Sequence, residues 1–186
     1  MNNCSFLQVI AKSFIECLKT SNRSNKKLII LHGEIANDIS NILDSNYKVH
    51  SLGIGKNKEG KIKGRYLEKV VDILIENNNE TVAGIGVKFV MNNYAQNSNN
   101  YFENMLGETA NIRSGGDAYF QILILPEEMP YYDKNNVIAK WELITEHNME
   151  KYIKLSNDNI ENYFHTPIKT LIYIVKMPEC NKSIIK

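Results

Sequence analysis

Cysteine is scarce in this sequence. The 186 residues include three cysteines (Cys4, Cys17 and Cys180), an odd number with no C-x-x-C spacing. A disulfide scaffold or a cysteine zinc site would need more cysteines in paired or closely spaced positions. We therefore expect a protein of a reducing compartment, in which Cys17 belongs to the apolar face of a helix and is not a nucleophile.

Long apolar runs are also missing. No apolar segment approaches the roughly 20 residues that a membrane span needs. The first ten residues have neither the basic region nor the small-residue cleavage site that are typical of a secretory signal. We expect a cytoplasmic protein with no membrane partner.

Charge of one sign is not in excess. The net charge is +1, from 22 basic and 21 acidic residues, and 43% of the residues are hydrophobic. This balance excludes a polycation that binds any nucleic acid, although a local basic patch remains compatible with it. The apolar fraction is high enough for a real core, which excludes a disordered chain.

The hydrophobic periodicity predicts an α/β fold. Apolar residues recur at helical spacing in some segments and form continuous or alternating runs in others. We expect a central mixed β-sheet flanked by helices on both faces. The predicted helices cover residues 4–20, 26–44, 94–113 and part of 137–155, and the predicted strands are YKVHSLGI, RYLEKVVDILIE, TVAGIGVKFV, AYFQILILP and IKTLIYIVK.

The length favours a single domain over residues 1–186. Within it, residues 1–24 would form an N-terminal helix and residues 25–130 the catalytic core. Residues 178–186 are expected to be a frayed tail. The sequence contains neither an internal repeat nor a segment with the composition of an interdomain linker.

Two charged residues interrupt strands that are otherwise apolar. Asp72 lies within VVDILI, and Lys88 lies within GIGVKFV on the next predicted strand. A charge inside a buried strand costs several kcal/mol unless it is paired or faces a polar cleft. One interpretation is a structural Asp–Lys pair in an ordinary α/β domain. The other is a catalytic site, because a carboxylate and a lysine on adjacent strands can hold a divalent metal and act on its bound water.

The segment GRYLEKVVDILI…AGIGVKF resembles the PD-(D/E)XK nuclease superfamily, especially the type II restriction endonucleases, over roughly residues 30–130. The resemblance implies a restriction endonuclease-like fold and Mg²⁺-dependent hydrolysis of double-stranded DNA, usually by a homodimer. It implies that Asp72 is a metal ligand and that Lys88 is catalytic. It further implies a glutamate from the preceding helix, for which Glu34 is the best candidate, and a backbone carbonyl near Val87.

The sequence departs from that family at Gly86. The family's second carboxylate stands two residues before the lysine, and a glycine there cannot ligate a metal. Three explanations stay open: the acid has migrated to another element, the copy is inactive, or an acidic residue has been replaced to inactivate the protein. We also expect Gly86 to leave open space on the face that it shares with Lys88. Glu34 would supply the missing acid or, alternatively, is a solvated surface charge.

A lysine-rich loop precedes the strand that carries Asp72. KNKEGKIKGRYLEK includes Lys61, Lys63 and Arg65, which are placed to contact phosphates if the loop is more than ordinary surface. After Lys88, the segment NNYAQNSNNYFEN contains Asn92, Asn93 and Gln96, whose amides can read base edges or bind phosphate.

Other catalytic motifs are not present. The four histidines, His32 among them, show no metal-binding spacing, and the sequence has no Walker A, G-x-S-x-G or G-x-G-x-x-G motif. The leading hypothesis is thus a type II restriction-type endonuclease with Mg²⁺. The alternatives are an inactive protein of the nuclease fold that binds DNA or a protein partner, and an unrelated α/β domain.

Overall fold

The fold was analysed in a computed structural model, which describes residues 1–20 and 24–176. Cys180 and the expected tail at 178–186 lie outside these ranges. The helices are α1 (Asn3–Lys19), α2 (Lys26–Ile42), α3 (Tyr94–Arg113) and α4 (Glu146–Ser156). The strands are β1 (Tyr47–Ser51), β2 (Gly60–Lys63), β3 (Glu68–Val71), β4 (Ile73–Asn77), β5 (Glu80–Phe89), β6 (Ala118–Pro126), β7 (Glu128–Tyr132), β8 (Ile138–Leu143) and β9 (Lys169–Val175).

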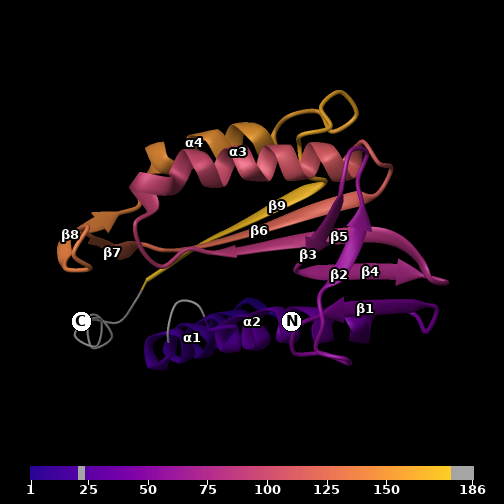
Figure 1. Cartoon of the computed structure of the whole chain (residues 1–186), viewed down its shortest axis with the longest axis horizontal. Helices are drawn as coiled ribbons and strands as arrows, with labels where there is room; N and C mark the ends of the chain where they lie inside the picture. The colour runs from indigo at the N-terminus through magenta and orange to yellow at the C-terminus, as the bar shows by residue number, and fades with distance from the viewer. Residues whose placement is uncertain (21–23, 177–186) are drawn as a thin grey trace. The chain divides into compact units, whose positions relative to one another are not determined.

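The described chain has an α/β fold with a mixed five-stranded sheet, as the sequence predicts (Figure 1). The strand order in this sheet is β1-β4-β5-β6-β9, and β2-β3 and β7-β8 form two further two-stranded sheets. β4 pairs in antiparallel orientation with β1 on one side and with β5 on the other, whereas β6 and β9 pair in parallel orientation. The presence of helices on both faces and a restriction endonuclease-like fold remain predictions.

The contacts divide the chain into two compact units. The first contains residues 1–63 and 68–85, and the second contains residues 64–67 and 86–186. β5 contributes its first part to one unit and its last part to the other. The single domain expected from the length remains a prediction, and the units are described separately.

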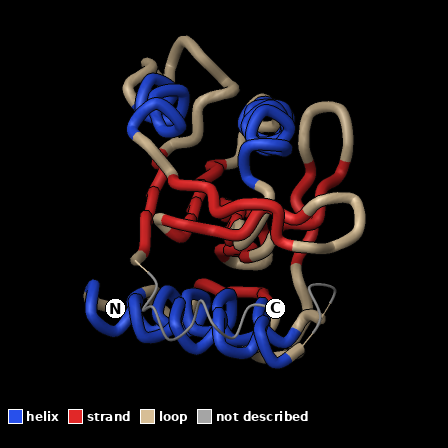
Figure 2. The backbone as a smooth tube through the Cα atoms, turned by 90° about the vertical axis from the view of Figure 1, so that its left-hand side faces the viewer, coloured by secondary structure: helices blue, strands red, loops and turns tan. Residues whose placement is uncertain are grey.

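The first unit begins with a pair of helices that lie side by side (Figure 2). Asn2 caps α1 by accepting a hydrogen bond from the Ser5 backbone N–H, and the Ser5 hydroxyl in turn accepts from the Asn2 N–H. This reciprocal cap satisfies backbone donors that have no partner within the helix. The buried side chains of α1 include Phe6, Ile10 and Phe14, which follow the helical spacing of the predicted stripe.

β4 and β5 form the expected antiparallel hairpin. The turn between them is Asn78-Asn79, with φ values of 52° and 67°. Positive φ at both central residues matches the twist of the flanking strands, and asparagine tolerates this conformation better than most residues.

The prediction of one strand over RYLEKVVDILIE is wrong. β3 ends at Val71, Asp72 forms a bend, and β4 begins at Ile73. The chain changes partner at this point, because β3 pairs with β2 whereas β4 pairs with β1 and β5. Asp72 therefore lies between two strands and is partly exposed.

The second unit contains α3, α4 and the parallel pair β6 and β9. Its core includes Tyr94 from α3, Leu125 from β6, Met129 from β7 and Tyr152 from α4. The sequence correctly predicts α3 and β6. It also correctly predicts a short helix in part of residues 137–155, which is α4, whereas it does not predict that Ile138–Leu143 pairs with β7 as a strand.

The close approach of two backbones in the first unit gives a test of its packing. A Cβ added to Gly53 would meet the Ile29 carbonyl oxygen and the Gly33 Cα, at 2.9 Å from the latter. Gly53 also has a φ of 80°. Gly55 has a φ of 54°, but a Cβ there would meet nothing within 4 Å.

We therefore expect Gly53→Ala to destabilise the protein much more than Gly55→Ala. Each substitution incurs a left-handed backbone penalty of about 1 kcal/mol. Gly53→Ala adds an overpacking cost of roughly 1–3 kcal/mol, because the opposing atoms are backbone atoms. Urea denaturation of both variants measures the difference, and equal losses would contradict the described packing.

Candidate metal centre

Three potential ligands converge in the first unit although they are far apart in the sequence. His32 comes from α2, Glu59 from the loop before β2, and Asp72 from the bend between β3 and β4. One ligand atom of each lies within 4.8 Å of the others. His32 is buried, and Glu59 and Asp72 are half-buried. The cluster joins an imidazole to two carboxylates, a donor set that binds divalent metal ions.

Backbone contacts position the segments that carry these ligands. The Ser51 hydroxyl, at the end of β1, donates a hydrogen bond of 2.7 Å to the Asp72 carbonyl oxygen. The Asn57 side-chain oxygen accepts a hydrogen bond of 2.6 Å from the Gly53 N–H, which closes the turn that leads to Glu59. Gly33, next to His32, lies against Gly53. Each of the segments that carry the three ligands is thus in contact with the end of β1 or with the turn that follows it.

His32 is neutral at physiological pH. It is 1% exposed, and its Nδ1 lies 3.7 Å from a carboxylate oxygen of Asp72. Loss of solvation lowers the pKa of His32 to about 4, and the negative charge of Glu59 only partly opposes this effect. Among the residues that the structure describes, neither ring nitrogen has a hydrogen-bond partner. A buried polar group without a partner costs about 1–3 kcal/mol, and a metal ion would satisfy one nitrogen.

The carboxylates repel one another. Burial raises the pKa of Glu59, and the negative charge of Asp72 raises it further, while His32 has the opposite effect. A divalent cation between the two acids would remove this repulsion. The buried imidazole and the adjacent acids therefore fit a metal ion by their chemistry.

The combination of one imidazole and two carboxylates affects which metal ion the site would bind. Mg²⁺ prefers oxygen ligands and keeps several waters, whereas an imidazole nitrogen also suits Mn²⁺ and the later transition metals. The two carboxylates fit either group, and the imidazole favours a transition metal ion, Mn²⁺ among them, over Mg²⁺. Mg²⁺, which the resemblance implies, remains a prediction.

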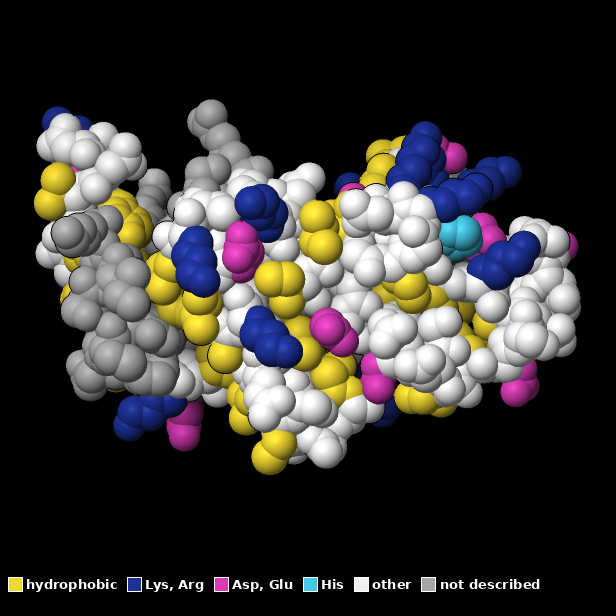
Figure 3. Space-filling view, turned by 90° about the horizontal axis from the view of Figure 1, so that it is seen from below, with side chains coloured by type: hydrophobic (Ala, Val, Ile, Leu, Met, Phe, Trp, Pro, Cys, Tyr) yellow, Lys and Arg dark blue, Asp and Glu magenta, His cyan; other side chains and the backbone are white. Residues whose placement is uncertain are grey.

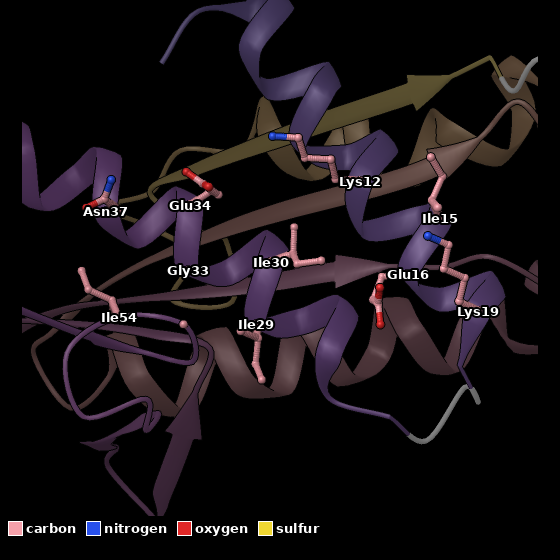
Figure 4. Close-up of a pocket in the computed structure, with 11 residues that line it drawn as sticks. Lys12, Ile15, Glu16, Lys19, Ile29, Ile30, Gly33, Glu34, Asn37 and Ile54 are labelled. Atoms are coloured by element: carbon pink, nitrogen blue, oxygen red, sulfur yellow. The ribbon is translucent and has the colours of Figure 1, made fainter.

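Glu34 does not belong to this cluster. It is exposed on α2 and lines a groove of about 500 Å³ with residues of α1, including Lys12 and Glu16 (Figure 4). Charged side chains of both signs and exposed apolar side chains share the face of the first unit that contains α1 and α2 (Figure 3). The position of Glu34 fits the alternative of a surface charge, and its role as a metal ligand remains a prediction.

Lys88 and Val87 belong to the second unit. Val87 is buried, and Lys88 is exposed near the end of β5, with its Nζ 4.8 Å from the centre of the Tyr101 ring. Lys88 also lines a small cavity of about 80 Å³ that Gln121 borders. The expectation of a lysine buried within the strand is wrong, because Lys88 follows the last fully buried positions of β5. The roles that the resemblance implies for Lys88 and Val87 remain predictions.

The expectation of open space at Gly86 is also wrong. Gly86 is buried, and a Cβ there would lie against the Tyr119 hydroxyl and 2.8 Å from Oε1 of Gln121. Tyr119 is 0% exposed, so it has little room to move. An acidic side chain at position 86 would have to displace both neighbours.

The residues predicted to bind nucleic acid differ in availability. Lys63 and Arg65 are exposed, whereas Lys61 forms an exposed ion pair of 2.6 Å with Glu68. This pairing raises the pKa of Lys61, chiefly through its hydrogen bond to Glu68. Lys61 therefore has a protein partner with which a phosphate would compete.

The amide residues before and within α3 also differ. Asn93 adopts a φ of 48°, accepts a hydrogen bond from the Tyr132 N–H and donates one to the Tyr132 carbonyl oxygen. It therefore has a structural role between α3 and β7. Gln96 is exposed, and it accepts a hydrogen bond from Asn93. Asn92 is half-buried, and a contact of these amides with DNA remains a prediction.

Sequence reasoning missed two of the three clustered residues. The histidines have no metal-binding spacing that would single out His32, and Glu59 lies in a lysine-rich segment whose composition does not mark it as a ligand. The available signal was a histidine between Leu31 and Gly33 on the apolar side of a predicted helix, since a histidine buried there needs a polar partner. The sequence could not identify that partner, because it comes from distant segments.

Comparison of the chain with models of protein families, with curated proteins and with solved structures found no match. Among residues 1–20 and 24–176, no helix combines the length and the apolar character needed to cross a membrane.

The lowered pKa of His32 predicts a loss of stability in acid. Between about pH 6.5 and 4 the unfolded chain protonates this histidine whereas the folded chain does not, so the free energy of unfolding falls as the pH falls through this range. This lowering of the His32 pKa corresponds to about 3 kcal/mol of stability at neutral pH. Urea denaturation in EDTA at several pH values should show this loss in the wild type and a smaller loss in His32→Leu. An equal pH dependence of the two proteins would show that His32 is not buried in its neutral form.

Proposed function

We propose that this protein is a divalent-metal-dependent endonuclease that hydrolyses phosphodiester bonds of double-stranded DNA, with the metal held by His32, Glu59 and Asp72. The observation that carries the proposal is the convergence of these three side chains, with a buried imidazole that lacks a hydrogen-bond partner in the described chain. A titratable group whose pKa is strongly shifted by burial, as that of His32 is, is typical of functional sites when it lies in such a cluster.

The three ligands contribute to metal binding in different ways, according to their charge and protonation state. The carboxylates of Glu59 and Asp72 supply the negative charge that attracts the cation, and the neutral His32 binds without first losing a proton. When bound, a divalent ion polarises a phosphoryl oxygen and lowers the pKa of a coordinated water. The burial of His32 keeps solvent from one side of the site, and the partly exposed acids leave the other side open to a substrate.

The segment that follows Glu59 supports DNA as the substrate. Glu59 directly precedes β2, so a ligand and the basic β2–β3 hairpin are neighbours in the chain. Lys56, Lys58, Lys63 and Arg65 in this region are exposed. Exposed basic side chains bind phosphates and release counterions, which provides affinity that does not depend on base sequence.

The order of elements supports a relation to the type II restriction endonucleases. The resemblance implies the order helix, strand, Asp72-bearing strand, Lys88-bearing strand, helix and buried strand. α2, β1, the β3–β4 segment with Asp72 at its bend, β5, α3 and β6 follow one another in this order. In this proposal Glu59 is the migrated acid that replaces the carboxylate missing at Gly86. A contribution of Lys88 to catalysis, a homodimer and a cytoplasmic location are further parts of the hypothesis.

A second candidate function is DNA or protein binding by the same fold without cleavage. The packing of Gly86 against Tyr119 and Gln121 favours this alternative, because an acid would not fit at the family's usual position. The two candidates differ in one measurable property, since only the first requires the metal for a chemical step.

Metal binding and cleavage of supercoiled plasmid distinguish them. Asp72→Asn and Glu59→Gln each remove one carboxylate charge with little change in size, and we expect each to lower Mn²⁺ affinity by at least about tenfold and plasmid cleavage by about a hundredfold or more. Glu34→Gln is the matched control on the same unit and should leave both unchanged, because Glu34 lies outside the cluster. Calorimetry with Mn²⁺ and a cleavage assay with Mg²⁺ and Mn²⁺ give the two readouts.

The outcomes separate the candidates clearly. Metal binding that depends on Asp72 and Glu59 without any cleavage favours the binding protein. Cleavage that survives both substitutions, or that is lost in Glu34→Gln, contradicts the proposed site. Circular dichroism of each variant checks that a loss of activity does not come from unfolding.

A further inference from the structure

The turn that joins β2 to β3 is held rigidly by one side chain. Asn111 of α3 accepts hydrogen bonds from the backbone N–H groups of Tyr66 and Leu67 through its Oδ1, at 2.9 and 3.3 Å. Its Nδ2 donates to the Leu67 carbonyl oxygen at 2.9 Å, and its own carbonyl oxygen accepts from the Arg65 N–H at 2.8 Å. One residue thereby satisfies most of the polar backbone groups of residues 65–67.

Close packing fixes the turn further. Asn111 is 8% exposed, and a Cβ on Gly64 would collide with its amide group. The Gly64 N–H also donates to the Leu67 carbonyl oxygen at 3.2 Å, which closes the turn. A turn with this many backbone contacts has little conformational entropy left to lose when it binds a partner.

This rigid turn presents large apolar side chains to solvent. Tyr66 is 80% exposed and Leu67 is 55% exposed. The Arg65 guanidinium carbon lies 5.7 Å from the centre of the Tyr66 ring, within the range of a cation–π contact. An ordered backbone that holds an exposed aromatic ring beside an arginine is suited to a ligand with flat faces and negative charge.

The charge of the hairpin favours a nucleic acid as that ligand. Basic residues outnumber acidic ones in Gly60–Val71: Lys61, Lys63, Arg65 and Lys69 are accompanied by Glu68 alone. The exposed guanidinium of Arg65 complements a phosphate, while the aromatic ring and the leucine complement the faces of bases. An apolar protein surface would use the two apolar side chains but would not complement Arg65.

We propose that Tyr66 stacks on an unstacked base of a DNA strand, with Leu67 as its apolar neighbour and Arg65 on a flanking phosphate. This inference rests on the proposed function for its choice of DNA as the ligand. It adds that the protein distorts the duplex, or prefers DNA that is already distorted, because a base must leave its stack to meet the ring.

Equilibrium binding in EDTA tests the proposal without any cleavage. The probe is a DNA duplex that contains 2-aminopurine in an unpaired position, and the variants are Tyr66→Ala and Tyr66→Phe. Stacking on an aromatic ring is worth about 1–3 kcal/mol per base, so Tyr66→Ala should bind about 5- to 150-fold more weakly and should lose the change in 2-aminopurine fluorescence. Tyr66→Phe keeps the ring and should retain both properties.

A matched control and the salt dependence complete the test. Tyr163 is 47% exposed on another segment of the second unit, and Tyr163→Ala should bind DNA as the wild type does. The slope of log K against log salt should be the same for the wild type and Tyr66→Ala, because no charge is removed. Because Tyr66 is largely exposed, the melting temperature of Tyr66→Ala should also stay close to that of the wild type.

The outcomes distinguish this inference from the proposed function. Unchanged affinity and fluorescence in Tyr66→Ala overturn the stacking role even if the wild type cleaves DNA. Binding that depends on Tyr66 in a protein that never cleaves DNA supports the stacking role and contradicts the nuclease. A wild type that does not bind DNA in EDTA even at low salt overturns the inference and points to a protein partner for the turn.

Discussion

The close contact of the α2 backbone with the turn after β1 is the constraint on which the first unit depends. Gly33 and Gly53 meet without side chains between them, and a Cβ on either residue would lie 2.9 Å from the Cα of the other. The contact has a direct consequence for chemistry, because His32 precedes Gly33 and the turn at Gly53 leads to Glu59. A bulkier residue at either glycine would push the helix away from the turn and separate the histidine from the acids.

Without a bound cation, the cluster of His32, Glu59 and Asp72 destabilises the folded protein. A histidine is buried in its neutral form without a hydrogen-bond partner in the described chain, and burial together with the negative charge of Asp72 raises the pKa of Glu59. Such conflicts are expected at functional sites, where local stability is sacrificed for chemistry. A bound cation would remove both conflicts at once, which is why a metal centre explains the cluster better than a structural ion pair does.

The sequence predicts the elements whose signals are local. α3 and β6 have strong periodicity or a continuous apolar run with clear breakers, and their bounds agree with the structure. The sequence does not predict the interruption at Asp72, because a change of strand partner leaves the hydrophobic pattern intact. The strand at Ile138–Leu143 is not predicted either, since its mixed polarity comes from a two-stranded sheet with most of its residues exposed or half-buried.

The candidate site was predictable only in part, for the same reason. Asp72 stands out in the sequence because a charge among apolar residues needs an explanation. His32 and Glu59 look ordinary until the fold brings α2, the loop before β2 and Asp72 together. The space above Gly86 could not be judged from the sequence either, because Tyr119 and Gln121 come from a strand more than thirty residues away.

The most direct test of the metal centre is a crystal structure of the protein grown with Mn²⁺, with anomalous diffraction recorded above the manganese absorption edge. The account predicts an anomalous peak within bonding distance of an imidazole nitrogen of His32 and of carboxylate oxygens of Glu59 and Asp72. No peak at this position at saturating Mn²⁺, or a manganese ion held instead by Glu34, would contradict it.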